Sequence, residues 1–142
     1  MSRIVDASVA SKWFFPEPGS PEAERLLSEH DPLMAPDLIV AEVCNVAWKR
    51  LRSGEITEAH ATRAMAQIGR MVDVLSPLAD LAPRAIEIAR ALDHPAYDCF
   101  YLALAEREHT YLVTADDGLI RRVASTPWAR HARSLVPRRR QR

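Results

Sequence analysis

The sequence predicts an α/β fold, and three observations support this prediction. Short β-branched or apolar runs alternate with longer segments whose apolar residues recur at helical spacing. Clusters of Pro and Gly, as at 16–19, separate these segments, and no repeat or low-complexity linker interrupts them. The chain of 142 residues has the length of one domain. We expect one folded domain over 1–137 and a basic C-terminal tail over 138–142.

Local signals place the elements in order along the chain. Strands are expected at 3–6, 33–35, 72–75, 111–114 and 134–136. Helices are expected at 9–15, 20–27, 38–51, 57–71, 85–92, 96–106 and 119–123. Ser20 and Thr57 are suitable N-caps for two of these helices, and Gly54 follows the end of another. The helix at 96–106 is apolar on nearly all sides, so we expect it to be central.

Charge is distributed unevenly although the formal net charge is zero. Residues 1–117 hold all 19 acids but only 11 Lys and Arg, whereas residues 118–142 hold eight arginines and no acid. Such a chain is expected to bind an anionic polymer along one edge and to reserve its acids for a cation. For the terminal Arg138–Arg140, two interpretations are equally open: binding of an anionic polymer, or a plainer role as a solubilising tail or a segment that docks on an acidic partner surface.

The sequence also indicates the cellular compartment in which the protein is expected. No apolar run approaches the length of a membrane span, and the N-terminus lacks the basic and apolar regions of a signal segment. We therefore expect a cytoplasmic protein. Cys44 and Cys99 lie in apolar helical stretches without a C-x-x-C pair, so buried, reduced thiols are expected.

Several common sites are not supported by the sequence. The four glycines form no G-x-G-x-x-G motif and no phosphate-binding loop. The five histidines show no H-x-x-x-H spacing and no clustering with cysteine, which argues against a zinc site. No G-x-S-x-G motif is present for a serine hydrolase. The remaining candidates are carboxylates in unusual places.

Two acids follow strands. Asp6 ends the first expected strand, and Asp116 follows the strand at 111–114. Ligands of open parallel sheets gather outside the carboxyl ends of the strands, so both side chains are well placed for a site. Each also has an ordinary structural explanation: Asp6 can be a helix N-cap, and Asp116-Asp117-Gly118 can be a turn.

Two further acids interrupt apolar helices. Glu42 has Leu38 and Val46 on its own face of the helix, so its ionisation needs a compensating cation or donors. The alternative is an edge carboxylate that reaches water or pairs with Lys49. Asp98 is the only charged residue in 96–105. The helix dipole would stabilise its charge by less than about 1 kcal/mol, whereas burying an unpaired charge costs several times more. A role as a ligand is therefore favoured for Asp98.

One cation explains these acids together. Without a bound cation, each of the four carboxylates would need its own structural explanation. The expected ion is hard and oxygen-seeking, Mg²⁺ or Mn²⁺, and the chemistry that such a site commonly performs is phosphoryl transfer or hydrolysis. Crowded carboxylates without metal should also show at least one raised pKa.

Four segments of the chain resemble the PIN-domain family. They are Ile4–Phe14, Ala41–Asn45, Tyr97–Ala105 and Leu112–Asp116, in the order and at the spacing of the family. Within the family they look like the VapC ribonuclease toxins of bacterial type II toxin–antitoxin pairs. The resemblance covers nearly the whole chain.

The resemblance carries specific expectations. It implies a three-layer α/β/α domain with a central parallel sheet, and an endoribonuclease dependent on Mg²⁺ or Mn²⁺ that hydrolyses RNA phosphodiester bonds, in tRNA or other structured RNA, with metal-activated water. It also implies a homodimer and a cognate, VapB-like antitoxin, joined in a heterotetramer or larger assembly.

The resemblance also assigns residues. The catalytic and metal-binding acids are expected to be Asp6, Glu42, Asp98 and Asp116. Small polar residues that would hold these acids in place are Ser8, Asn45 and Thr114, together with Asp117, which the family pattern does not require. The arginine-rich C-terminal region is not part of the family signature; independently of the resemblance, we expect Arg121, Arg122 and Arg130 to contact flanking phosphates.

Two other functions fit parts of the pattern. A non-catalytic module could use the same fold to receive a partner peptide, although four intact acids argue against it. A receiver-like or dehalogenase-like phosphoryl-transfer domain needs paired acids at the first strand and a lysine after a later strand. Here position 8 is Ser, and the only lysines are Lys12 and Lys49.

Overall fold

The structure is a computed structural model that describes residues 1–137. Its strands are β1 (Arg3–Val5), β2 (Leu33–Pro36), β3 (Val74–Ser76), β4 (Leu112–Thr114) and β5 (Ala132–Ser134). Its α-helices are α1 (Ala7–Ala10), α2 (Ser20–Ser28), α3 (Leu38–Arg52), α4 (Glu58–Met71), α5 (Leu78–Leu92), α6 (Ala96–Arg107) and α7 (Asp117–Val123). The predicted tail at 138–142 lies outside the described residues.

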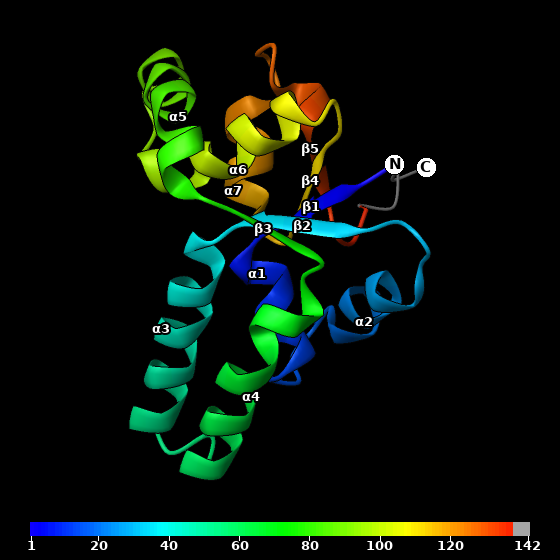
Figure 1. Cartoon of the computed structure of the whole chain (residues 1–142), viewed down its shortest axis with the longest axis vertical. Helices are drawn as coiled ribbons and strands as arrows, with labels where there is room; N and C mark the ends of the chain where they lie inside the picture. Colours follow the sequence, from blue (N-terminus) through cyan, green and yellow to red (C-terminus); the bar gives the residue numbers. More distant parts are fainter. Residues whose placement is uncertain (138–142) are drawn as a thin grey trace.

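The strands form one parallel sheet between two layers of helices. The order across the sheet is β3-β2-β1-β4-β5, and every neighbouring pair is parallel. Helices α5, α6 and α7 cover one face, and α1 to α4 lie on the other, where α3 and α4 extend away from the sheet as a hairpin (Figure 1). The three-layer α/β/α architecture with a central parallel sheet is therefore confirmed.

Helix α6 is the central helix of its layer. It packs between α5 and the middle strands, and its run from Tyr101 to Ala105 is buried. Burying each large apolar side chain of such a helix contributes about 1.5–3 kcal/mol, which fixes its position on the sheet. Asp98 lies in the first turn of this helix and repels Asp6, which follows β1, so the packing of α6 also fixes Asp98 near this end of the strands.

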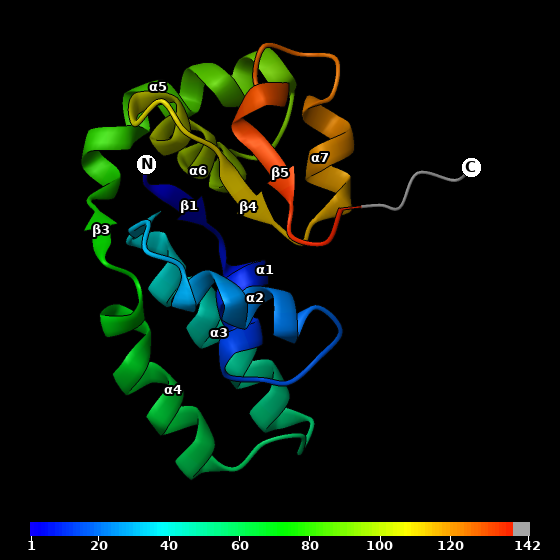
Figure 2. The same ribbon diagram turned by 90° about the vertical axis from the view of Figure 1, so that its right-hand side faces the viewer.

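The path of the chain creates a switch point between β1 and β4. From β1 the chain proceeds to β2 and β3 on one side, and it continues through β4 to β5 on the other (Figure 2). The helical connections that follow β1 and β4 therefore lead to opposite faces, which opens a crevice at the carboxyl ends of these strands. Asp6 follows β1 at this point, and Asp116 follows β4.

Some expectations from the sequence need correction. The last strand begins at Ala132 and not at 134, because its pairing with β4 aligns Leu112 with Ala132 and Thr114 with Ser134. Cys99 is buried as expected, but Cys44 is exposed, since the helix turns that position to solvent. Thr57 is confirmed as an N-cap, with its hydroxyl oxygen accepting from the backbone N–H of His60 at 3.1 Å. None of the helices in 1–137 combines the length and apolar character needed to cross a bilayer.

Candidate functional site

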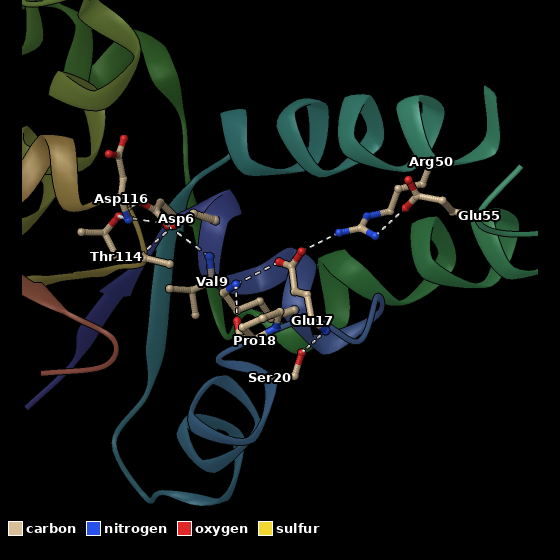
Figure 3. A network of polar contacts seen from close by, with 12 residues as sticks. Asp6, Val9, Glu17, Pro18, Ser20, Arg50, Glu55, Thr114 and Asp116 are labelled. Atoms are coloured by element: carbon tan, nitrogen blue, oxygen red, sulfur yellow. Dashed lines mark hydrogen bonds and ion pairs between the residues drawn. The ribbon is translucent and has the colours of Figure 1, made fainter. Parts of the chain in front are cut away.

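Asp6 lies at the switch point in a dense set of hydrogen bonds. The Ser8 hydroxyl donates to its Oδ1 at 2.5 Å, and the Thr114 hydroxyl, from the end of β4, donates to its Oδ2 at 2.5 Å. The backbone N–H of Val9 also donates to Oδ1, at 3.3 Å, so Asp6 is the N-cap of α1. Figure 3 shows the contacts of Val9 and Thr114 with Asp6. Capping and a site role are compatible, because the cap holds the carboxylate in one orientation.

Burial makes this carboxylate difficult to ionise. Asp6 is only 7% exposed, and its desolvation is the main reason that its pKa rises from 3.8 to about 6. The hydrogen bonds from Ser8, Thr114 and Val9 oppose this rise, whereas repulsion from Asp98 adds to it. Near neutral pH, Asp6 thus carries a charge that the folded protein stabilises poorly.

Glu42 reaches the same region from α3. The Tyr101 hydroxyl, on α6, donates to Glu42 Oε1 at 2.5 Å. Burial is the main cause of the raised pKa of Glu42, and repulsion from Asp98 increases it further. The same burial and the nearby acids raise the pKa of Tyr101 well above its usual range, so its hydroxyl stays protonated and donates. The partner of Glu42 is therefore Tyr101 and not Lys49.

Asp98 contacts a histidine one helical turn before it. His94 Nε2 lies 2.7 Å from Asp98 Oδ2, and the two side chains are 21% and 32% exposed. Asp98 also contributes to the raised pKa values of Asp6 and Glu42. The three acids therefore lie within electrostatic reach of one another.

Asp116 is placed differently from the other three acids. Its backbone N–H donates to Thr114 Oγ1 at 3.0 Å, which connects it to Asp6 through Thr114. Its carboxylate is exposed and caps α7, with Oδ1 accepting from the Leu119 N–H at 3.1 Å. Among the described residues, no hydrogen bond joins this carboxylate to another of the four acids, and Figure 3 shows it directed away from Asp6.

The small polar residues divide into two groups. Ser8 and Thr114 both donate to Asp6, and the Ser8 hydroxyl also accepts from the Ala115 N–H at 2.9 Å. Asn45 and Asp117 are exposed on α3 and α7. Thus the structure brings Ser8 and Thr114 to the acids, whereas Asn45 and Asp117 stand at the surface.

The three predicted phosphate-contacting arginines are also separated. Arg121 and Arg130 are exposed. Arg122 is exposed as well, but its guanidinium donates to the carbonyls of Leu92 and Asp93, the latter at 3.1 Å. Arg122 therefore provides hydrogen bonds to backbone carbonyls at the C-terminal end of α5. The sequence did not indicate this structural role.

The site has the charge and donor chemistry of a cation site. Among the described residues, no lysine or arginine contributes to the pKa shifts of Asp6 or Glu42, so their negative charge lacks a cationic partner. Carboxylate oxygens are the ligands that Mg²⁺ and Mn²⁺ prefer. As the side chains stand, however, no group of three or more Asp, Glu, His or Cys within 1–137 is arranged to hold a metal ion. The carboxylates instead form hydrogen bonds with hydroxyl groups and, for Asp98, with the His94 imidazole.

Two residues of this site were missed from the sequence. Tyr101 and His94 each contact one acid, and both flank Asp98 at helical spacing. The i,i+4 spacing of His94 and Asp98 was a usable signal, although Pro95 between them obscured where the helix begins. Tyr101 had no comparable signal, because its partner Glu42 lies 59 residues away.

Comparison with known proteins agrees with the fold. The family model described as "PIN domain" matches residues 3–125. Ribonuclease VapC3 from Pyrobaculum aerophilum is 32% identical over 118 residues, which cover 82% of this chain and 90% of that protein.

Solved structures give the same result for the fold. The crystal structure of PAE2754 from Pyrobaculum aerophilum has a TM-score of 0.69 and 24% identity, covering 95% of this chain and 92% of its own. A toxin–antitoxin complex from Klebsiella pneumoniae has a TM-score of 0.69 and 16% identity, covering 96% of this chain and 99% of its own. The chain therefore belongs to the PIN-domain family, and its relatives within that family include a VapC ribonuclease.

Proposed function

We propose that this protein is a metal-dependent endoribonuclease that hydrolyses RNA phosphodiester bonds with Mg²⁺ or Mn²⁺. The observation that carries the proposal is that Asp6, Glu42 and Asp98 lie together near the switch point, where Asp98 repels both other acids and, among the described residues, no lysine or arginine offsets the buried charge of Asp6 and Glu42. The similarity to Ribonuclease VapC3 supports RNA as the substrate class.

Each residue has a distinct task in this proposal. Asp6, Glu42 and Asp98 would hold the cation, and Asp116 would join them by turning its exposed carboxylate inward. The bound cation would activate the attacking water and stabilise charge on the phosphate. Ser8 and Thr114 keep Asp6 in one orientation, and the Tyr101 hydroxyl does the same for Glu42. Neutral donors suit this role because they leave the negative charge available to the cation.

Biologically, we propose a toxin that acts in the cytoplasm and is controlled by a VapB-like antitoxin. The solved neighbours from Klebsiella pneumoniae, Rickettsia felis and Haemophilus influenzae are titled as toxin–antitoxin or VapBC structures. A homodimer that binds antitoxin as a heterotetramer or larger assembly is the corresponding proposal for the quaternary structure.

A cleavage assay tests the proposal. Purified, antitoxin-free protein is expected to cut structured RNA, tRNA included, in Mg²⁺, to lose this activity in EDTA and to regain it with added Mn²⁺. Mapping of the ends should give a 5′-phosphate and a 3′-hydroxyl. Equal cleavage with and without EDTA contradicts metal dependence. Tight antitoxin binding without any cleavage in Mg²⁺ or Mn²⁺ indicates a binding module instead.

A further inference from the structure

A cleft of about 410 Å³ lies beside the acids, at the carboxyl ends of β4 and β5. We propose that it receives a nucleobase of the RNA next to the scissile phosphate, and that it selects bases that carry an amino group. This proposal rests on the proposed function and adds a specificity subsite to it. The volume is within the range of about 300–1,000 Å³ that is typical of small-molecule sites.

The cleft shares a wall with the acidic site. Thr114 and Ala115 line it: Thr114 donates directly to Asp6, and the Ala115 N–H donates to Ser8, whose hydroxyl in turn donates to Asp6. One threonine side chain therefore separates the cleft from the Asp6 carboxylate. An RNA strand with a phosphate at the acids has its adjacent nucleoside within reach of this cleft.

The opposite wall is a loop held in a fixed shape. Lys12 Nζ donates to Glu17 Oε1 at 3.0 Å and to the Pro18 carbonyl at 2.8 Å, and Arg50 ties Glu17 to α3 (Figure 3). Gly19 has a φ of +93°, and a Cβ there would lie 3.3 Å from Lys12 Cε. A glycine is therefore needed at this position for the loop to pack closely on the Lys12 side chain.

The lining favours a base over a phosphate. Pro18, Leu135 and Val136 supply apolar walls. The Lys12 ammonium, the one cation in the lining among the described residues, is already bound to Glu17 and Pro18. Within the part of the chain that the structure describes, a phosphate in this cleft would thus meet no unpaired positive charge, whereas a flat, largely apolar ring matches the walls.

Two carboxylates provide the selectivity. Glu22 and Asp117 both line the cleft. Within residues 1–137, the one ion pair of Glu22 is a long contact with Arg25, at 3.7 Å, and Asp117 is exposed. Carboxylates accept hydrogen bonds from exocyclic amino groups, as they do from N4 of cytosine, and they repel carbonyl oxygens such as O4 of uracil. Cytosine is therefore expected to bind more tightly than uracil, which has the same size.

Binding of single nucleotides in EDTA tests the subsite without any cleavage. Cytidine and uridine 5′-monophosphates are titrated into the protein while backbone amide signals are followed by NMR. Because both carry the same phosphate, their difference reports on the base alone. We expect shifts at Gly19, Ala115 and Val136, and a dissociation constant at least about fivefold lower for the cytidine nucleotide.

Three variants complete the experiment. Glu22→Gln with Asp117→Asn should reduce the cytidine-to-uridine ratio to about one, because an amide can donate as well as accept. Glu24→Gln, an exposed position on the same helix outside the cleft, is the matched control and should keep the ratio. Equal binding of the two nucleotides to the unmodified protein, or shifts clustered elsewhere, overturns the proposal.

A competing ligand identifies the alternative occupant. N-acetylarginine amide presents a guanidinium group that carboxylates also bind. Tighter binding of this probe than of the cytidine nucleotide assigns the cleft to a basic peptide and overturns the nucleobase proposal. All these measurements are made without metal, so a failed RNA cleavage assay contradicts the proposed function and leaves the binding result unaffected.

Discussion

Asp98→Asn is expected to lower RNA cleavage at least about 100-fold while the protein stays folded. Asp98 is the acid whose charge reaches both Asp6 and Glu42, so its loss removes a carboxylate from the proposed cation site. The side chain is 32% exposed at the start of α6, and asparagine has the same shape, so the fold should tolerate the change. Initial rates in saturating Mg²⁺, with circular dichroism and melting curves, measure both effects.

The matched control for this variant is Asp80→Asn. Asp80 is an exposed acid in the first turn of α5, so it shares the helix-dipole environment of Asp98 but lies outside the site. It should cleave RNA at the rate of the unmodified protein. Undiminished cutting by highly purified Asp98→Asn protein would contradict the assignment of this acid.

Without metal, the stability of Asp6→Asn relative to the unmodified protein is expected to increase by up to about 3 kcal/mol as the pH rises from below 3.8 to above 6. The pKa of Asp6 is about 6 in the folded chain against an ordinary value of 3.8, and each pKa unit corresponds to about 1.4 kcal/mol. Because the folded pKa is raised, the associated stability is fully present below pH 3.8 and is lost as the pH rises through 6. Asparagine has no charge to form, so it avoids this loss.

Urea unfolding in EDTA between pH 4.5 and 7.5 measures this effect. The difference in unfolding free energy between Asp6→Asn and the unmodified protein should grow with pH and level off above pH 6. Other groups also make the stability depend on pH. The raised pKa of Glu42 lowers the stability as the pH rises, as that of Asp6 does, whereas the lowered pKa of Glu106 has the opposite effect. Taking the difference between the two proteins removes these shared contributions. A difference that does not change with pH contradicts the burial of an ionisable Asp6.

The sequence predicted most of the fold because the relevant signals are local. Helical spacing and strand composition identified the main elements, and the apolar run around Asp98 identified the central helix. Features that depend on distant partners were less accessible. The position of β5 is determined by its register with β4, and the exposure of Cys44 by which side of α3 faces the core.

In the candidate site, too, local features could be predicted from the sequence, whereas features that depend on distant partners could not. Asp6 and Asp116 could be located at strand ends, and Glu42 and Asp98 as charges in apolar surroundings. Their individual partners could not be foreseen, because the contacts of Thr114 with Asp6 and of Tyr101 with Glu42 join residues far apart in the chain. Nor could the sequence show that the Asp116 carboxylate caps α7.

The central claim is that Asp6, Glu42 and Asp98 share one divalent cation, and calorimetry of the antitoxin-free protein tests it most directly. Titration with Mn²⁺ at pH 6 should show saturable binding that Asp98→Asn greatly weakens. Because the pKa of Asp6 is about 6, binding should also release protons, detected as a dependence of the heat on the ionisation enthalpy of the buffer. Absence of Mn²⁺ uptake, or equal uptake by the variant, would contradict the account.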